Sequence, residues 1–580
     1  MLEYALTVLL LLINFVVLNC LLRQRRRKRT EPPLIHHYLP FIGSALDFGK
    51  DPLNYLMNLK EKYGDVYTIE LAGWNAHVFA NPLDVRNLER TKALDHKDII
   101  GDFVTCMVGK NHYIHNNPDN TGPSFLERLM GRAHSVEQIE PTPAKISKSI
   151  EHALDSNLRG SMQLSDLCHI AKDSVVIALR KLLQDVGVHK GTRKVHLYDM
   201  CKRIIFDITF NLFFGSLPDP VKRAEETARF YDVFKIYFAG SPLMVDRIPV
   251  HLLPATKRAL AKILEMIGEI NWSERNNVSQ LITDIVDSNP HIDFKDARAR
   301  HLMIILWSAQ ANTAPALFWT LAHLLKNPDA KRAVLKEFEE FNGRYRLRGR
   351  SSAEPTADAS WPQMNNILSL KKKDIDKLVV LDGCLKETMR LTGSSMSVRK
   401  AMQDTVINTS SGRQYAIRKG DYTIFFAPVT HMDHEIFESP KEYDYDRFLI
   451  GEHEGVLSSC VPSSSCDSDS QNSEPTQLLG TLRSRSRFYK AGQRIAASRS
   501  IMTFGFGSTR CPGRHIAMIE IKLVTLALLK HFDVKICEPD KPLPDFDLTH
   551  LGFGVMPPSQ DVRVRIALPD DHNNNMRQAF

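Results

Sequence analysis

Residues 504–513 read FGFGSTRCPG, a glycine-rich loop (the cysteine loop) that leads into an apolar, helix-like stretch. Gly505, Gly507 and Gly513 permit backbone conformations that a β-carbon disfavours, so the loop can turn tightly. Cys511 then lies at the start of the predicted helix, beside unpaired N–H groups and the positive end of the helix dipole. We expect such a site to lower the pKa of the thiol and to favour the thiolate, which is the form that binds metal.

A lone thiolate cannot build a tetrahedral zinc site. It can be the single axial ligand of a haem iron, whose equatorial bonds come from the porphyrin. A buried structural cysteine is the alternative, and for a cysteine considered alone it is the better one. The pattern F-x-x-G-x-x-x-C-x-G is more specific, because average composition gives it by chance on the order of once in a thousand such chains. This stretch resembles the haem-binding signature of the cytochrome P-450 family.

The composition is that of an ordinary globular protein, with 43% hydrophobic and 24% charged residues among 580. The nine cysteines show no zinc-like or disulfide-framework spacing, which fits a reducing compartment. The net charge is +8, and residues 1–29 hold six positive charges and Glu3, so the rest of the chain carries only about +3. No broad basic surface for nucleic acid is therefore expected.

The N-terminal segment predicts a membrane anchor. Residues 4–22, YALTVLLLLINFVVLNCLL, are mostly apolar and about long enough to cross a bilayer as a helix. A cleaved signal peptide, the alternative, usually has basic residues before a shorter apolar core. Here the basic run RQRRRKR, residues 23–29, follows the core. Because positive flanks stay cytoplasmic, we expect an uncleaved anchor over 1–29, with the bulk of the chain in the cytosol.

The order of elements after this anchor resembles the entry to the P-450 fold. Residues 30–50 are proline-rich and predict a stiff hinge. Residues 51–63 predict a first helix, and 66–80 contain the two strands of a short hairpin. Helical periodicity then dominates residues 140–340. We therefore expect a mainly α protein with small β-sheets and the cytochrome P-450 fold.

Two polar segments have compositions that cannot bury enough apolar surface to order themselves. One is 343–361; the other, 452–498, is serine-rich and then basic. We expect 452–498 to be a disordered surface insertion, in preference to a phosphorylated or partner-binding segment. The catalytic domain is then expected to span 51–568, followed by a polar tail at 569–580.

The apolar stretch 296–326 predicts a long buried helix with an interruption. Its centre, SAQANT at 308–313, is small and polar, and Pro315 cannot donate to the carbonyl of Ala311, so a kink is expected. A packed helix with an incidental proline kink is the alternative. In the P-450 family this place holds an acid and a threonine that deliver protons during oxygen activation. Here those positions are Ala311 and Asn312.

The motif S-A-Q-A-N-T-A-P-A-x-F-W is similar to one branch of that family. The branch holds sterol 7α- and 12α-hydroxylases, oxysterol 7α-hydroxylases and prostacyclin synthase, in which asparagine replaces the usual threonine. Asn312 can donate and accept hydrogen bonds but cannot transfer a proton as an acid. The resemblance therefore implies proton delivery through ordered water or Thr313, with both residues as catalytic candidates. Ala309 is a candidate for the substrate pocket.

Glu387 and Arg390 are three residues apart on a predicted helix, so they share a face and can form an ion pair. An E-x-x-R pair alone is weak evidence, since Glu226 and Arg229 form another. The first pair is favoured because it precedes the cysteine loop and a strand-rich stretch. Arg447, in the segment YDRF, resembles the arginine that completes a triad with this pair. The resemblance implies a structural clamp for the cysteine loop.

The resemblance also implies the contacts of a haem b cofactor, with Cys511 as the iron ligand. Arg399 resembles a haem-propionate ligand, because a guanidinium suits a carboxylate; a solvated arginine is the alternative. The other candidate haem-binding residues lie in the cysteine loop: Phe504, Gly505 and Arg510. Two expected groups are missing. No tryptophan occurs between 100 and 160, and Thr509 stands where the family usually has an arginine.

The implied function is that of a membrane-anchored haem-thiolate monooxygenase. It would insert one atom of O2 into a C–H bond of a sterol or oxysterol, with ring position 7 as one candidate. Electrons would come from NADPH through NADPH–cytochrome P-450 reductase, because the chain shows no dinucleotide-binding glycine fingerprint between a strand and a helix. The implied location is the endoplasmic reticulum membrane. Three C-terminal residues are candidates for the substrate pocket, with an ordinary edge hairpin as the alternative: Leu551, Phe553 and Val555.

Two other functions remain open from the sequence. The first is a prostacyclin-synthase-like isomerase, which rearranges an endoperoxide and needs neither oxygen nor a reductase. Loss of the usual threonine fits this function, although Thr313 after Asn312 and the intact C-P-G are closer to the sterol hydroxylases. The second is a non-catalytic haem-binding sensor, which has no reason to bind sterol beside the iron.

Overall fold

A computed structural model describes most of the chain. The described residues are 27–37, 42–108, 144–187, 191–245, 248–287, 295–348, 370–450, 483–484, 487–552 and 554–568. Residues 1–26 of the predicted anchor, the predicted tail, Phe553 and most of the predicted insertion lie outside them. Within the described ranges, no helix is both long enough and apolar enough to cross a bilayer.

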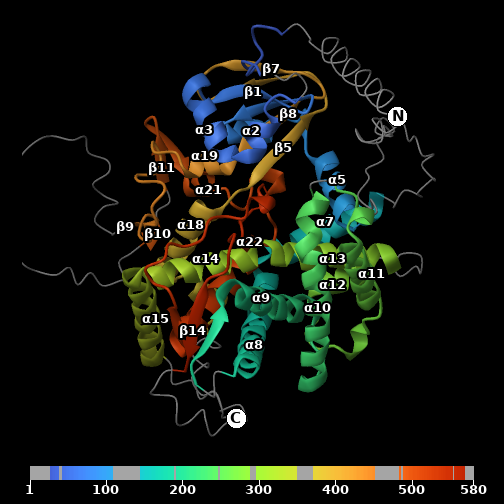
Figure 1. Cartoon of the computed structure of the whole chain (residues 1–580), viewed down its shortest axis with the longest axis vertical. Helices are drawn as coiled ribbons and strands as arrows, with labels where there is room; N and C mark the ends of the chain where they lie inside the picture. The colour runs from blue at the N-terminus through green and yellow to red at the C-terminus, as the bar shows by residue number, and fades with distance from the viewer. Residues whose placement is uncertain are drawn as a thin grey trace, which may run out of the picture.

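Most strands gather in a β-rich part, at the top of Figure 1, above a larger helical part. The strands are β1 (Val66–Leu71), β2 (Trp74–Phe79), β3 (Leu94–Asp95), β4 (Arg193–His196), β5 (Met396–Ala401), β6 (Thr405–Asn408), β7 (Gln414–Ile417), β8 (Tyr422–Phe426), β9 (Leu449–Ile450), β10 (Arg483–Ser484), β11 (Arg487–Lys490), β12 (Gln493–Ala496), β13 (Asp533–Ile536) and β14 (Arg563–Ala567).

The α-helices make up most of the described structure, which confirms the predicted mainly α class with small sheets. They are α2 (Ala45–Lys50), α3 (Pro52–Tyr63), α4 (Val85–Arg90), α5 (Lys97–Val108), α7 (Ala144–Arg159), α8 (Ser161–Val186), α9 (Leu197–Phe214), α10 (Pro220–Val245), α11 (Pro254–Gly268), α12 (Gln280–Asp287), α13 (Lys295–Ala311), α14 (Thr313–Lys326), α15 (Pro328–Arg348), α17 (Lys372–Ile375), α18 (Val379–Thr392), α19 (Ala427–His431), α21 (Ala497–Ser500) and α22 (Arg514–His531).

The largest described sheet has the strand order β1-β2-β8-β5-β3, with β2 and β8 parallel and the other pairs antiparallel. β1 and β2 form the predicted hairpin, and α3 is the helix predicted over 51–63. The predicted hinge over 30–50 is wrong at its C-terminal end, because α2 is helical from Ala45 to Lys50. Both faces of the sheet are covered. Leu56 and Leu59 of α3 pack on one face, and Met502 and Phe506 pack on the other. The sheet therefore holds the beginning of the cysteine loop.

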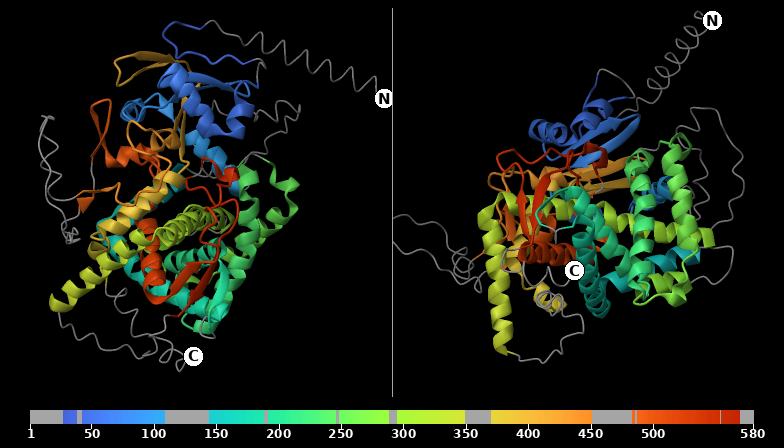
Figure 2. Two further views of the ribbon diagram at one scale, coloured as in Figure 1. Left: turned by 60° about the vertical axis from the view of Figure 1, so that its left-hand side comes forward. Right: turned by 60° about the horizontal axis from the view of Figure 1, so that its bottom comes forward.

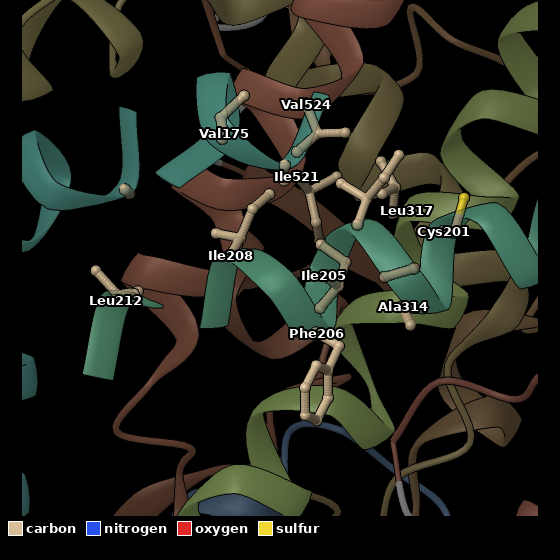
Figure 3. Close-up of a cluster of buried hydrophobic side chains, with 14 of the residues drawn as sticks. Val175, Cys201, Ile205, Phe206, Ile208, Leu212, Ala314, Leu317, Ile521 and Val524 are labelled. Carbon is tan, nitrogen blue, oxygen red and sulfur yellow. The ribbon is translucent and has the colours of Figure 1, made fainter. Parts of the chain in front are cut away.

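Helix α22, which follows the cysteine loop, is buried in the helical core. Figure 2 shows α22 running through the middle of the helical part when the molecule is viewed from below. It packs against α8 and α14. Figure 3 shows the apolar side chains where these helices meet α9: Val175 of α8, Ile205 and Ile208 of α9, Leu317 of α14, and Ile521 and Val524 of α22. The helix that starts at the cysteine loop is thus fixed by the main hydrophobic core.

The C-terminal strand β14 alternates as the sequence predicted. Val564 and Ile566 are buried, and Arg563 and Arg565 are exposed. β14 pairs with β13 on one side and with β4 on the other. The alternative of an ordinary edge hairpin is therefore wrong for β14, which is the central strand of a three-stranded sheet, with β4 supplied by a segment far earlier in the chain.

The predicted insertion at 452–498 is wrong at its C-terminal end. β11 and β12 form an antiparallel hairpin over 487–496, and α21 follows it directly. The Phe488 ring packs against the rings of Phe437 and Phe448, with centroid separations of 5.2 and 5.3 Å. The average composition of the segment did not reveal this hairpin, because its order depends on a few buried side chains, Phe488, Lys490 and Ile495, whose partners include residues forty or more positions away. The polar segment predicted from 343 likewise begins inside α15, which continues to Arg348.

Glu520 on α22 leads to a prediction about pH. Its side chain is 2% exposed, and burial raises its pKa to about 8. An exposed glutamate has a pKa of about 4.3. The buried neutral acid therefore contributes stability at low pH that is lost as the pH rises through about 8. Glu520→Gln cannot ionise, so we expect its thermal midpoint to exceed that of the parent by several degrees at pH 9 and to match it near pH 5.

Thermal unfolding from pH 5 to 9 measures this difference. Glu339→Gln is the matched control, because Glu339 is an exposed glutamate paired with Lys530. An unchanged pH dependence in Glu520→Gln would contradict the prediction.

Candidate active site

The cysteine loop is a closed turn built on two left-handed glycines. Gly505 has φ +69° and Gly507 has φ +60°, conformations that favour glycine. The N–H of Cys511 donates to the carbonyl of Phe504 (2.9 Å), which closes the loop. A β-carbon on Gly507 would also lie 2.9 Å from the side chain of Glu89. Gly513 differs from the prediction, because its φ of −75° is open to any residue.

Cys511 is partly exposed and lies three residues before the first residue of α22. Burial raises the pKa of its thiol, while the N–H groups of Gly513 and Arg514 and the charge of Arg514 act to lower it. The N–H groups at the helix start therefore act to lower the pKa of the thiol, as predicted. The predicted net lowering of this pKa is wrong for the polypeptide alone. The reason is that burial removes water from the sulfur.

Arg399 on β5 supplies the test of whether the site fits a haem. Its side chain is 4% exposed, and its Nε and Nη2 atoms have no hydrogen-bond partner among the described residues. Burial lowers its pKa, opposed by Glu89 and Asp95. The guanidinium also lies 5.7 Å from the centroid of the Phe506 ring, in the cysteine loop. A buried unpaired guanidinium beside this loop fits the carboxylate of a haem propionate.

Other predicted loop residues are placed as follows. Phe504 and Arg510 are partly buried, and no hydrogen bond from the Arg510 side chain is present within the described residues. The hydroxyl of Thr509 donates to the carbonyl of Phe506 (2.8 Å), so it serves the loop itself. Residues 109–143, most of the region without tryptophan, lie outside the described residues.

One face of α13 is uncovered although the helix is otherwise buried. Ser308 is exposed, and three residues beside it on this face are partly exposed: Ile304, Ile305 and Ala309. Their spacing of i, i+1, i+4 and i+5 places them on one side of a helix. The structure thus puts the predicted pocket residue Ala309 on an apolar open face with one hydroxyl. Ser308 was not among the predicted site residues, although its position one helical turn before Asn312 could have indicated that it lies near the site.

The predicted kink is confirmed as a break at Asn312. α13 ends at Ala311 and α14 begins at Thr313, while Asn312 has φ −111° and ψ −30°. The backbone N–H of Val555 donates to Oδ1 of Asn312 (2.8 Å). A β-carbon on Gly554 would lie 2.4 Å from the same oxygen, so glycine allows this close approach. The side chain of Asn312 therefore holds the C-terminal loop, a role that the sequence did not predict.

The C-terminal loop, residues 551–556, is tied to the protein on several sides. Met556 N–H donates to the carbonyl of Thr392 (3.0 Å), and the Trp319 indole donates to the carbonyl of Met556 (2.7 Å). Leu551 is partly buried against the cluster on the α3 side of the sheet, whereas Val555 is buried in the main core. The loop therefore brings Leu551 and Val555 to different surroundings, and Phe553 lies outside the described residues.

Asn312→Leu is expected to free the amide of Val555. The variant keeps a similar volume but removes the acceptor, and an unpaired buried donor costs about 1–3 kcal/mol. Hydrogen exchange at residues 554–556 should then be about 5- to 100-fold faster, as measured by mass spectrometry. Asn327→Leu at the other end of α14 is the matched control, because the side chain of Asn327 bonds only the carbonyl of His323 among the described residues. Equal exchange in both variants would contradict the assignment.

The three predicted clamp residues meet in the structure. Glu387 and Arg390 are both 0% exposed and form two hydrogen bonds, of 2.7 and 2.8 Å. Arg447 Nε donates to Glu387 Oε1 at 3.1 Å. Arg390 also donates to the carbonyls of His431 (2.8 Å) and Pro440 (2.6 Å). The other E-x-x-R pair is not formed, because Glu226 binds Arg275.

His431 links the clamp to the cysteine loop. Its carbonyl accepts from Arg390, and its Nε2 accepts from the N–H of Met502 (3.1 Å), two residues before the loop. Burial and Arg390 lower the pKa of His431 to about 3, so the ring is neutral and can accept this bond. Thr503 makes a second link, donating to the carbonyl of Met389 on α18 (2.9 Å). These two contacts give the predicted clamp a physical route to the loop.

Comparison with known proteins agrees with this fold. Residues 147–464 and 484–564 match the sequence profile of cytochrome P-450. The solved structure of retinoic acid-bound cyanobacterial CYP120A1 superposes with a TM-score of 0.59 at 17% identity, covering 94% of this chain and all of that one. The chain belongs to the cytochrome P-450 family.

Within this family, the similar curated proteins match nearly the whole chain. Cholesterol 7-alpha-monooxygenase of Cricetulus griseus is 28% identical, covering 94% of this chain and 95% of that protein. Human 7-alpha-hydroxycholest-4-en-3-one 12-alpha-hydroxylase is 27% identical, covering 97% of each. These relatives belong to the branch that the motif around Asn312 indicated. The chain is therefore a P-450 monooxygenase of this branch, and the family implies a haem iron and a redox partner.

Proposed function

We propose that the protein hydroxylates a sterol or oxysterol, using O2 and electrons from NADPH. The observation that carries the proposal is the break at Asn312, set in an apolar helix with one uncovered face. The relatives named for sterol 7α- and 12α-hydroxylation support it. Both ring positions occur among these relatives, so position 7 is one of two candidates for the site of attack.

Haem b is the proposed cofactor, and when bound it supplies the oxygen-activating chemistry. Cys511 is the proposed iron ligand, and Arg399 is the proposed partner of a propionate. The support for Arg399 is its buried guanidinium, which lacks a partner among the described side chains. Phe504, Gly505 and Arg510 are the proposed loop contacts. The clamp of Glu387, Arg390 and Arg447 would keep this loop in place through His431 and Thr503.

The uncovered face of α13 is the proposed substrate wall. Ile304, Ile305 and Ala309 present apolar surface suited to a rigid sterol ring system, and Ser308 adds one hydroxyl. From the C-terminal loop, Leu551 is the proposed residue of the substrate pocket, and Phe553 is a further candidate. Val555 is a weaker candidate than predicted, because it is buried in the main core.

Thr313 is the proposed proton donor among the described residues. Asn312 is engaged through its Oδ1 by Val555, and an amide cannot act as an acid. Thr313 is buried next to the break, and its hydroxyl makes no hydrogen bond to another described group. It can hold an ordered water and pass a proton through it, while Asn312 keeps the helix open.

The proposed setting is the endoplasmic reticulum membrane. Residues 1–29 would be the anchor, 30–50 the hinge and 51–568 the cytosolic catalytic domain. NADPH–cytochrome P-450 reductase is the proposed electron donor. Arg159 and Arg514 both act to lower the pKa of Cys511, so two positive charges lie on the cysteine side of the molecule. Such a surface suits an acidic electron-transfer partner.

A sterol panel tests the proposed function. Sterols and oxysterols are added to the haem-loaded protein, and a type I difference spectrum reports displacement of water from the iron. We expect such a shift with at least one oxysterol, and a hydroxylated product only with both NADPH and reductase. Product formed without either would favour the isomerase, and no shift with any sterol would favour the haem sensor.

A further inference from the structure

A basic cavity lies between the segment that follows the proposed anchor and the β6–β7 hairpin. Its volume is about 630 Å³. On one side it is lined by Arg27, Lys28, Arg29, Glu31, Pro32, Pro33, Leu34 and His36, and on the other by Arg413, Gln414 and Tyr415. It belongs to the β-rich part, whereas Cys511 leads into a helix of the main core.

Both walls of this cavity are held by backbone hydrogen bonds. Ala416 N–H donates to the carbonyl of Thr30 (2.8 Å), which joins β7 to the segment. Thr68 of β1 exchanges two bonds with the segment, donating to Pro33 (2.7 Å) and accepting from Ile35 (2.9 Å). The cavity is therefore part of the folded structure, although several of its side chains are exposed.

The cations in the cavity exceed the acids. Glu31 is the one carboxylate among the lining residues, and it is buried and paired with Arg418 and Arg27. Three lining cations remain exposed with no carboxylate partner in the described part of the chain: Lys28, Arg29 and Arg413. They come from both walls, so an anion in the cavity can meet positive charge on two sides.

We propose that this cavity binds the phosphorylated headgroup of an anionic phospholipid. Arginine and lysine suit phosphate oxygens, and Tyr415 adds a hydroxyl that can bond a sugar or inositol ring. The proposal rests on the proposed membrane location. The apolar run of the proposed anchor would end at Leu22, and the five residues from there to Arg27 reach at most ~18 Å when extended. The cavity would then lie within reach of the headgroups, where basic residues next to an anchor attract anionic lipid.

Binding of a short-chain fluorescent phosphatidylinositol phosphate tests this site. The full chain, loaded with haem in a neutral detergent, is titrated with the lipid and followed by fluorescence anisotropy. Each basic residue near a membrane surface contributes about fivefold to affinity. We therefore expect the double variant Lys28→Gln, Arg413→Gln to bind about 25-fold more weakly than the parent. A short-chain phosphatidylcholine should bind parent and variant equally weakly.

Arg494→Gln is the matched control, because Arg494 is an exposed arginine on another hairpin, in β12. Equal affinity of the parent and the double variant, or an equal loss in Arg494→Gln, would overturn the proposal. Competition by free inositol bisphosphate at the affinity of the lipid would assign the cavity to a soluble phosphate instead, and would overturn the lipid source. The sterol-induced spectral shift should be the same in all variants. A failure of lipid binding is therefore distinguishable from a failure of the proposed hydroxylase function.

Discussion

Cys511→Ala is expected to abolish the absorption band that carbon monoxide gives with a reduced thiolate-ligated haem. The physical reason is that the side chain of Cys511 is the one sulfur held by the cysteine loop, at the start of α22 and beside Arg514. Alanine has no atom that can bind the iron, and the two left-handed glycines that shape the loop remain unchanged. The loss should be complete, because no second cysteine is present in the loop.

The reduced-CO difference spectrum measures this loss, and total haem content is measured on the same sample. Cys537→Ser is the matched control, since Cys537 is also a partly exposed cysteine and lies after α22. It should keep the full band. A Cys511→Ala protein that still shows the thiolate band would mean that another residue holds the iron.

Glu387→Gln is expected to lower the free energy of unfolding by about 3–5 kcal/mol, the cost of breaking a buried ion pair on one side. Glutamine keeps the size of the side chain but removes the negative charge. Arg390, which is fully buried, and Arg447 would then face each other without a carboxylate between them. The cysteine loop should loosen as well, because Arg390 reaches it through His431.

Urea unfolding checks this result, with tryptophan fluorescence reporting the fold and the reduced-CO band reporting the loop. Glu339→Gln is the control, because its ion pair with Lys530 is exposed and should contribute no more than about 1 kcal/mol. If the two variants unfolded at the same urea concentration, the clamp would not have the stabilising role assigned to it.

The features that the sequence predicted well are those with local physical signals. Gly505 and Gly507 predict a tight loop, because few other residues adopt their positive φ angles. Pro315 predicts an interruption of the helix near Ala311, because proline has no N–H to donate to the carbonyl four residues before it. The pairing of Glu387 with Arg390 follows from helical spacing alone. The role of Arg447 could be predicted only from the family resemblance, because its contact with Glu387 joins residues sixty positions apart.

The features that the sequence did not predict depend on contacts between distant segments. Asn312 could be recognised as unusual, but its acceptor role depends on Val555, 243 residues later. The link through His431 has no sequence pattern of its own, because it joins the carbonyl and the ring nitrogen of His431 to Arg390 and to the backbone N–H of Met502. The direction of the pKa shift of Cys511 was also missed, since burial is a property of the packed molecule and not of the loop.

The contact between Asn312 and Val555 also has a consequence for the order of events on the ribosome. α13 and α14 leave the ribosome when little more than half of the chain has been made, but both of their ties to the C-terminal loop must wait for residues 555 and 556. Closing so long a loop is slow and is among the last steps of folding. A transcript that stops before codon 554 would therefore encode the clamp and a complete cysteine loop, yet Asn312 and Trp319 would lack their partners in the C-terminal loop.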